Sequence, residues 1–106
     1  MIGSLQAKEF SLLTPEERQK VVVLDVRTDE EYGLAHIPGT LHIPHTDVAD
    51  RSAELEKYRD QDIVLVCRSG GRSLFAAEVL HKQGFSRLFN LEGGMEEWAG
   101  DLHAFV

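Results

Sequence analysis

Residues 63–73 read Ile-Val-Leu-Val-Cys-Arg-Ser-Gly-Gly-Arg-Ser, an apolar run that stops abruptly at a polar turn containing two glycines. The run is too short for a helix, and its β-branched residues are typical of a strand. The pattern then changes. From Ser73 to Gln83 the apolar residues fall on one stripe of a helix, and Gly84 marks the end of that helix. A buried strand, a turn and a helix in this order indicate an α/β protein.

Three further runs have the same character as residues 63–67. Val21–Val26 is apolar on both faces, Leu88–Leu91 stops shortly before two glycines, and Thr40–Ile43 is closed by Pro44. A strand that is covered on both faces usually belongs to a parallel sheet. The sequence therefore predicts an α/β fold, with a central parallel sheet of four to five strands flanked by helices on both faces.

Four more helices are predicted outside this segment. In chain order they are a helix from Ser4 to Leu13 capped by Ser4, a short acidic turn capped by Thr28, a helix over Val48–Tyr58, and a helix that begins near Met95 and carries Trp98. Near the end of the chain, Leu102 and Phe105 are expected to cover the core.

The size and composition fit one domain, and residues 1–106 are expected to form it. The chain has 106 residues, of which 42% are hydrophobic. Its net charge of −7 argues against nucleic-acid binding and against docking on anionic membranes. The single cysteine excludes a disulfide framework and a multi-cysteine zinc site. A cytoplasmic location is expected, because no apolar run could span a membrane and the N-terminus lacks a signal pattern.

The turn after residues 63–66 carries the candidate functional residues. In α/β sheets, ligands bind at the carboxyl ends of the strands, which is where Cys67 is expected. Gly70 and Gly71 allow a tight turn that directs several backbone N–H groups towards one centre, and the following helix adds its positive end. Arg68 and Arg72 add two positive charges, and residues 63–77 contain no acidic residue. The sequence predicts a cationic loop that binds anions.

A cysteine in such a loop is expected to be a nucleophile. A free thiol has a pKa of about 8.5, and helix N-termini and neighbouring arginines lower this pKa to between about 3.5 and 7.5. Cys67 would then be a thiolate at neutral pH without a histidine base. The alternative is that Cys67 is simply a buried residue at the end of a strand, as most free cysteines are. The glycine turn, the two arginines and the helix start together favour the nucleophile.

Four motifs, in this order, resemble those of the rhodanese family, and specifically its small single-domain sulfurtransferases. Cys67–Ser73 is similar to the active-site loop of that family. The other motifs are Leu24–Arg27 with Glu31-Tyr32 (first strand and acidic turn), His36–Gly39 with Ile43-Pro44 (second signature), and Gly84-Phe85 with Leu91–Gly94 and Trp98 (C-terminal pattern). The resemblance spans residues 24–98, which is most of the chain, and the combination of motifs is highly specific.

The resemblance implies a sulfurtransferase that needs no cofactor and no metal. Cys67 would attack the outer sulfur of a small anionic donor such as thiosulfate, release sulfite and keep the sulfur as a persulfide. A thiophilic acceptor, either cyanide, a thiol or a protein, would then remove this sulfur. By the same resemblance, the residues that bind the anion or the persulfide are Arg27, Arg68, Ser69, Gly70, Gly71, Arg72 and Ser73.

Two other functions stay open. A sulfur relay or docking module would receive sulfur from a partner protein and have little thiosulfate activity, and no motif separates it from a thiosulfate enzyme. A small phosphatase or arsenate reductase is the second. Phosphatase relatives place one residue more between the cysteine and the arginine than the four that separate Cys67 from Arg72. On this family logic, the smaller ring suits a single sulfur atom better than a phosphoryl group.

Three residues depart from the usual pattern of the family, namely Ala35, Thr40 and His42. Ala35 stands where a glycine is usual, and it would be strained if the backbone there had a positive φ. We expect these departures to alter the loops beside the site and to leave the chemistry unchanged.

Other polar residues have simpler explanations. His36, His42 and His45 lie within ten residues of one another but match no zinc spacing, so no metal site is predicted. Asp25 is expected to fix the end of a strand, and for Arg27 this same role is the alternative to anion binding. Glu30-Glu31 is interpreted as a partner of a helix dipole, because adjacent residues of a helix do not face each other as a catalytic pair would.

Overall fold

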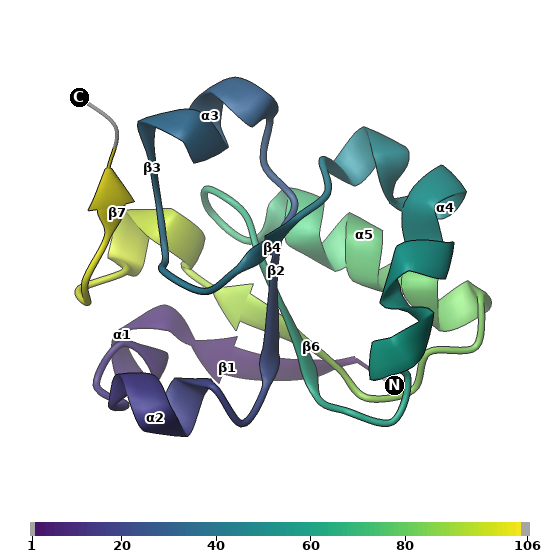
Figure 1. Cartoon of the computed structure of the whole chain (residues 1–106), viewed down its shortest axis with the longest axis horizontal. Helices are drawn as coiled ribbons and strands as arrows, with labels where there is room; N and C mark the ends of the chain where they lie inside the picture. The colour runs from purple at the N-terminus through teal and green to yellow at the C-terminus, as the bar shows by residue number, and fades with distance from the viewer. Residues whose placement is uncertain (1, 105–106) are drawn as a thin grey trace.

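The computed structural model describes residues 2–104 and contains a five-stranded parallel sheet (Figure 1). In spatial order the strands are β1 (Gly3–Gln6), β6 (Leu88–Glu92), β5 (Ile63–Val66), β2 (Val22–Asp25) and β4 (Leu41–His42). The central strands β5 and β2 are buried at every position. The predicted α/β fold, with a central parallel sheet and helices on both faces, is confirmed.

Two cores explain why the central strands are apolar at every position except Asp25, the last residue of β2. Leu24 and Leu65 face the core formed with α4 (Val48–Arg51), the 3-10 helix η2 (Ser52–Tyr58) and α5 (Gly71–Lys82). Their neighbours Val23 and Val64 face the other core, which includes residues of α1 (Ala7–Phe10). Because alternate side chains of a strand point to opposite faces, covering both faces requires an apolar residue at each position.

Two predicted helices form close to their expected positions. α3 (Asp29–Leu34) begins at the predicted cap, where Thr28 Oγ1 accepts from the backbone N–H of Glu31 and the Glu31 carboxylate accepts from the backbone N–H of Thr28. This reciprocal arrangement is a capping box. α5 begins two residues before the predicted start at Ser73 and ends at Lys82. The predicted helix over Val48–Tyr58 is divided into α4 and η2, and another 3-10 turn, η1 (His45–Asp47), precedes it.

The N-terminal segment differs from the prediction. Ser4 does not cap a helix but lies in β1, where it pairs with Asn90 of β6. The Ser4 hydroxyl donates to the Glu92 carboxylate at 2.9 Å. The helix that follows, α1, covers four residues only, and a further short helix, α2 (Pro15–Arg18), has its own capping box. The pairing of β1 with β6 outweighs the local preference of Ser4 for a cap, and such tertiary effects commonly override propensity.

The C-terminal segment also differs in detail. In place of a helix from Met95 there is a single 3-10 turn, η3 (Gly94–Glu97), with Trp98 directly after it. A second, antiparallel sheet joins β3 (Ala35–His36) to β7 (His103–Ala104), which was not predicted. Leu102 is 49% exposed, so its predicted place over the core is wrong, and Phe105 lies outside the described residues. Ala35 has an extended backbone with φ of −166°, so the alanine causes no strain there.

α5 positions the candidate site. It begins directly after the turn that follows β5, so its N-terminus lies at the carboxyl edge of the sheet. With 12 residues it is longer than the other helices in the described part of the chain. Within residues 2–104, no helix is long and apolar enough to cross a membrane.

Candidate active site around Cys67

Cys67 lies immediately after β5, with its thiol enclosed by the loop that leads into α5. The residue is only 1% exposed. Its Sγ accepts a hydrogen bond from the backbone N–H of Gly70 at 3.0 Å, and Ser73 Oγ lies 3.3 Å from the same sulfur. Gly70 makes this possible because its φ of +113° turns the chain back over the cysteine. Gly71 has an ordinary backbone and is the first residue of α5.

The surroundings of Cys67 lower the pKa of its thiol. Burial alone would raise this pKa, but four hydrogen bonds act in the opposite direction and outweigh it. They come from the hydroxyl of Ser73 and from the backbone N–H groups of Ser73, Gly70 and Ser69. The sequence predicts the same direction from the arginines and the helix start. The main causes that lower this pKa are backbone and hydroxyl donors at that helix start, and the charge of Arg72 interacts with the thiolate as well.

Ser73 is held in place by a residue that the sequence did not single out. The Ser73 hydroxyl is fully buried and lies within hydrogen-bond distance of three atoms: Cys67 Sγ, where either atom can be the donor, the carbonyl oxygen of Gly70 at 3.1 Å, and Oδ1 of Asn90. Asn90 is a buried polar residue on β6, which lies next to β5. A polar residue inside the apolar run Leu88–Leu91 was the signal that could have identified it, since buried polar groups need partners.

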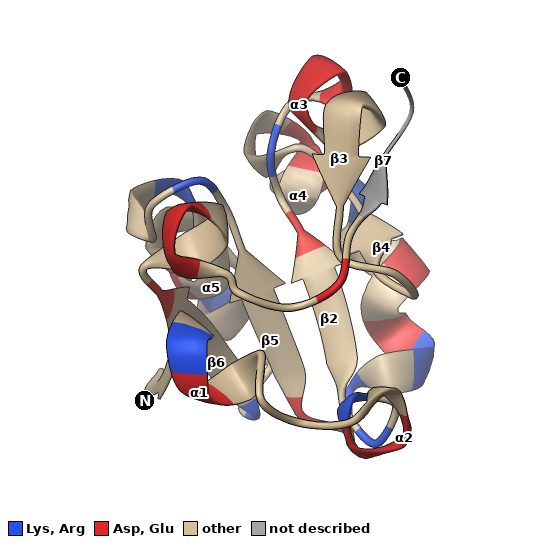
Figure 2. Ribbon diagram, turned by 90° about the vertical axis from the view of Figure 1, so that its left-hand side faces the viewer, with Lys and Arg blue, Asp and Glu red and all other residues tan. Residues whose placement is uncertain are grey.

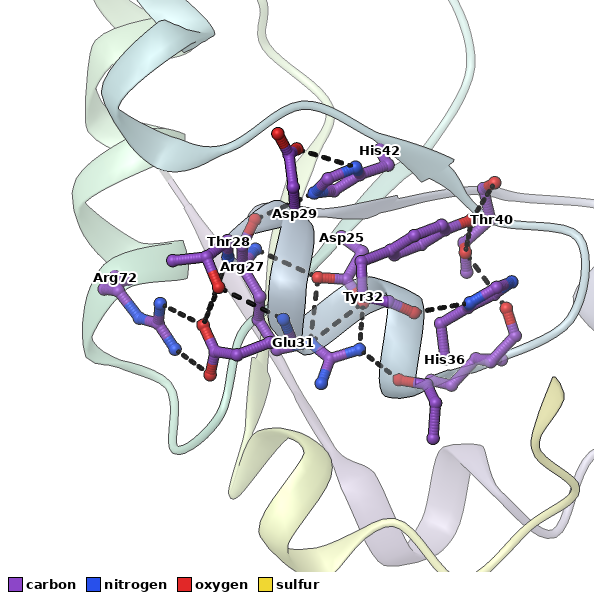
Figure 3. Close-up of polar contacts among 12 residues, drawn as sticks. Asp25, Arg27, Thr28, Asp29, Glu31, Tyr32, His36, Thr40, His42 and Arg72 are labelled. Atoms are coloured by element: carbon purple, nitrogen blue, oxygen red, sulfur yellow. Dashed lines mark hydrogen bonds and ion pairs between the residues drawn. The ribbon is translucent and has the colours of Figure 1, made fainter. Parts of the chain in front are cut away.

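Arg72 projects from α5 towards α3 and forms an ion pair with Glu31 (Figure 3). Its two terminal nitrogens donate to the two carboxylate oxygens at 2.7 and 2.9 Å, which is the bidentate geometry of a strong pair. The hydrogen bonds from Arg72 lower the pKa of Glu31 to about 2 despite partial burial. Glu31 was predicted as a partner of the helix dipole. It does belong to the first turn of α3, but it also anchors an arginine of the active-site loop.

Arg68 is paired as well, though more loosely. Its Nε lies 3.6 Å from the carboxylate of Glu96 in η3, and its side chain is 71% exposed. The loop is therefore less cationic than its own sequence indicates, because the fold brings a carboxylate to each arginine. Acidic residues colour most of α3 in the charge view (Figure 2).

Of the two roles considered for Arg27, anion binding and support of the strand end, its contacts match the second. It is buried, and its guanidinium donates to both carboxylate oxygens of Asp25 at 2.8 to 3.0 Å and to the carbonyl oxygen of Ala35 at 2.7 Å (Figure 3). Asp25 also accepts from the backbone N–H of Arg27. These contacts fasten the end of β2 to β3, as expected for Asp25. We therefore assign Arg27 to the support of the strand end and leave it out of the anion site.

Two of the three departures from the family pattern, Thr40 and His42, contact one tyrosine, Tyr32 (Figure 3). The ring of Tyr32 is stacked between the rings of His36 and His42, with centroid distances of 3.8 and 4.2 Å. The Tyr32 hydroxyl contacts Thr40. Thr40 and His42 thus shape the far side of α3, away from the Glu31–Arg72 pair. Within residues 2–104, no three histidine, cysteine or acidic side chains are grouped so that they could hold a metal ion.

Several proteins of similar sequence are named as sulfurtransferases or sulfur carriers. The family model of the rhodanese-like domain matches residues 8–101. The putative sulfur carrier protein YrkF of Bacillus subtilis is 46% identical over 78 residues, which are 74% of this chain and 41% of that protein. Thus the chain spans less than half of that relative. The thiosulfate sulfurtransferase GlpE of Pseudomonas fluorescens is 38% identical over 97 residues, 85% of each chain.

Solved structures with a similar fold include rhodanese-like domains. The crystal structure of a rhodanese-like domain protein from Staphylococcus aureus superposes with a TM-score of 0.78 and 29% identity, covering 99% of this chain and all of that one. The fold, the motifs and the sequence identity agree, and the resemblance predicted from the four motifs is confirmed. The chain belongs to the family of rhodanese-like domains.

Proposed function

We propose that this chain is a sulfurtransferase that carries a sulfane sulfur on Cys67. One observation supports this function above the others. The Sγ atom lies in a ring of hydrogen-bond donors, 3.0 Å from the Gly70 N–H and 3.3 Å from the Ser73 hydroxyl, and its pKa is lowered. A lowered pKa increases the fraction of thiolate, which is the nucleophilic form of cysteine. The same donors can stabilise negative charge on a second sulfur attached to the first.

The proposed reaction has two balanced steps. In the first, the Cys67 thiolate attacks the outer sulfur of thiosulfate, a new S–S bond forms, and the original S–S bond breaks. Sulfite leaves with the bonding electron pair, and the cysteine persulfide keeps one negative charge. In the second, a nucleophilic acceptor such as cyanide or a thiolate attacks the terminal sulfur. The S–S bond to Cys67 then breaks, and its electron pair restores the thiolate.

Within this proposal the loop residues have separate roles. The backbone N–H groups of Ser69, Gly70 and Ser73 hold the charged sulfur, and the Ser73 hydroxyl supplies a further donor. Gly71 leaves the first turn of α5 without a side chain beside the incoming donor. Arg68 is exposed and can meet an anionic donor at the surface. Arg72, fixed by Glu31, supplies a positive charge at a constant position beside the loop.

A steady-state assay with thiosulfate as donor and cyanide as acceptor tests the proposal. The expected result is thiocyanate formation with the parallel-line kinetics of a two-step transfer, and complete loss of the activity in Cys67→Ser. Serine is the suitable replacement because it keeps the size and the hydrogen bonds of the loop. Cysteine-dependent hydrolysis of an aryl phosphate, without thiocyanate formation, would contradict the proposal and favour a phosphatase.

A sulfur relay is the second candidate, and the similarity to a putative sulfur carrier protein favours it. In this case the donor would be a protein persulfide and not free thiosulfate. The pairing of both loop arginines with carboxylates is compatible with such a donor, because it reduces the attraction for a small dianion. Rapid labelling of Cys67 by a cysteine desulfurase with radioactive cysteine, together with slow thiosulfate turnover, would support the relay. The opposite ratio of rates would support the thiosulfate enzyme.

A further inference from the structure

The segment that follows β6 lies directly against the backbone of the active-site loop. The backbone N–H of Met95 donates to the carbonyl oxygen of Cys67 at 2.9 Å, and the backbone N–H of Glu96 donates to the carbonyl oxygen of Arg68 at 3.0 Å. Two consecutive peptide groups of the loop are thus held by two consecutive peptide groups of η3. These contacts belong to no helix or strand ladder.

The two hydrogen bonds determine which way the loop N–H groups point. A trans peptide is planar, and its C=O and N–H bonds are directed to opposite sides of the chain. When η3 holds the carbonyl oxygens of Cys67 and Arg68 on one side, the N–H groups of the next residues, Arg68 and Ser69, are directed to the other side. Backbone hydrogen bonding by Ser69 is among the causes that lower the pKa of the Cys67 thiol, as expected if this N–H faces the sulfur. The contact with η3 therefore fixes both the outward direction of the two carbonyl groups and the inward direction of the two N–H groups.

Gly94 is the residue that permits this close approach. Its φ is +51°, and a Cβ atom added there would overlap the carbonyl oxygen of Cys67 and lie 2.7 Å from that of Arg68. Both atoms are backbone, so neither can rotate away as a side chain would. A side chain at position 94 could be accommodated only if η3 and the loop moved apart, and the hydrogen bonds from Met95 and Glu96 would then lengthen.

We infer that Gly94 is a positioning residue for sulfur transfer, which acts by letting η3 hold the carbonyl groups of Cys67 and Arg68 so that the N–H groups of the loop face the sulfur. The inference rests on the proposed function only for the role of that sulfur. Gly94 has no side chain to contact the Cys67 thiol. Its effect on the reactivity of this thiol is transmitted through the backbone of the loop.

The variant Gly94→Ala tests the inference, with Gly39→Ala as its matched control. Gly39 also has a positive φ, +78°, but a Cβ atom added there meets nothing within 4 Å. Both variants therefore introduce backbone strain, and only one disturbs the loop. The readout is the rate of Cys67 alkylation by iodoacetamide as a function of pH, followed by intact mass. Iodoacetamide reacts with the thiolate, so the midpoint of the profile reports the pKa of the thiol.

The expected result is an upward shift of the alkylation midpoint by about one pH unit in Gly94→Ala, the size expected for the loss of a hydrogen bond to a charged group. In Gly39→Ala the midpoint should stay at the wild-type value. The charged side chains around the loop are the same in all variants: Arg68, Arg72, Glu31, Glu96 and the buried pair Asp25 and Arg27. An unchanged midpoint in folded Gly94→Ala would overturn the inference.

A second variant covers the case in which Gly94→Ala does not fold. Cys67 is the single cysteine, so residues 67–106 can be joined as a synthetic peptide to residues 1–66 by ligation at that cysteine. Replacing the amide N–H of Met95 by an ester oxygen removes its hydrogen bond to Cys67 and keeps every side chain. The midpoint should again rise, and a midpoint equal to that of the all-amide ligated chain would overturn the inference. Alkylation needs no sulfur donor, so failure of the proposed sulfur transfer would be recognised separately.

Discussion

Two arginine–carboxylate pairs flank the ends of the central strands, and they differ chiefly in burial (Figure 3). Arg27 and Asp25 form a pair whose side chains are 8% and 1% exposed, whereas Arg72 and Glu31 are 29% and 30% exposed. The hydrogen-bond lengths are similar in the two pairs. The same chemistry therefore serves two purposes: the buried pair fastens β2 to β3, and the half-exposed pair orients one side of the active-site loop.

The difference in burial predicts a difference in energetic effect. Removing one partner of a buried pair leaves an uncompensated charge in a region without water, which is strongly destabilising. A pair in contact with solvent contributes little, because water replaces the lost partner. Variants of the buried pair should therefore mainly lower the stability of the fold, whereas variants of the partly exposed pair should mainly affect the active-site loop.

The largest effect is expected for Asp25→Ala. This change leaves the Arg27 guanidinium buried without its carboxylate, and the free energy of unfolding should fall by about 3–5 kcal/mol. Equilibrium denaturation in urea measures it. Asp29→Ala is the control, because Asp29 is exposed and follows the same strand, and its effect should be within about 0.5 kcal/mol. Similar losses in the two variants would show that the buried pair has no special role.

A smaller effect is expected at Glu31, where two replacements separate its two contacts. Glu31→Gln keeps a side chain that can complete the capping box with Thr28 but removes the charge opposite Arg72, and should cost about 1 kcal/mol. Glu31→Ala removes both contacts and should cost about 2 kcal/mol. The same urea titrations apply. If Glu31→Gln lost no stability, the ion pair with Arg72 would have no energetic value, and if the two variants lost the same stability, the capping contact with Thr28 would have none.

The Glu31–Arg72 pair should also be visible in the pH dependence of stability. The pKa of Glu31 is lowered from 4.5 to about 2 in the folded chain. A carboxyl group with a lowered pKa stabilises the fold above its unfolded pKa, and this contribution is lost as the pH falls from about 4.5 to about 2. Glu31→Gln should therefore lose less stability than the wild type over this range. Parallel curves of unfolding free energy against pH would contradict the assignment.

The smallest effect is expected for Glu96→Gln. Its partner Arg68 is exposed and 3.6 Å away, so the pair should contribute less than about 0.5 kcal/mol. Thiosulfate turnover is the more informative measurement, because the change leaves Arg68 without a counter-ion and should lower the KM for a dianionic donor at low salt. Added salt should remove the difference. A KM that is unchanged at low salt would show that Arg68 does not meet the donor.

The central sheet could be predicted from sequence because its strands contain the necessary information locally. Val22–Asp25 and Ile63–Val66 are buried on both faces, and their runs of apolar residues, ended in β2 by Asp25, follow directly from that. β1 was missed because Gly3–Gln6 becomes a strand only by pairing with β6, which lies far along the chain. The turn at Cys67 could be predicted for a similar reason, because its glycines and arginines all lie within residues 67–73.

The electrostatics of the site could not be predicted in the same way. Residues 63–77 contain no acidic residue, and this window indicated a cationic loop. Glu31, which neutralises Arg72, is 41 positions away from it, and only the packing of α3 against the loop brings the two together. Asn90 behind Ser73 is another such case. Contacts between distant segments decide the charge of the site, and a local window contains no information about them.

Mass spectrometry of the intact protein after incubation with thiosulfate tests the central claim most directly. The account predicts a gain of one sulfur atom per chain in the wild type, its loss on addition of cyanide, and no gain in Cys67→Ser. Equal gains in the wild type and in Cys67→Ser would contradict the claim that Cys67 carries the sulfur. Absence of any gain, both from thiosulfate and from a cysteine desulfurase, would contradict sulfur transfer by this chain altogether.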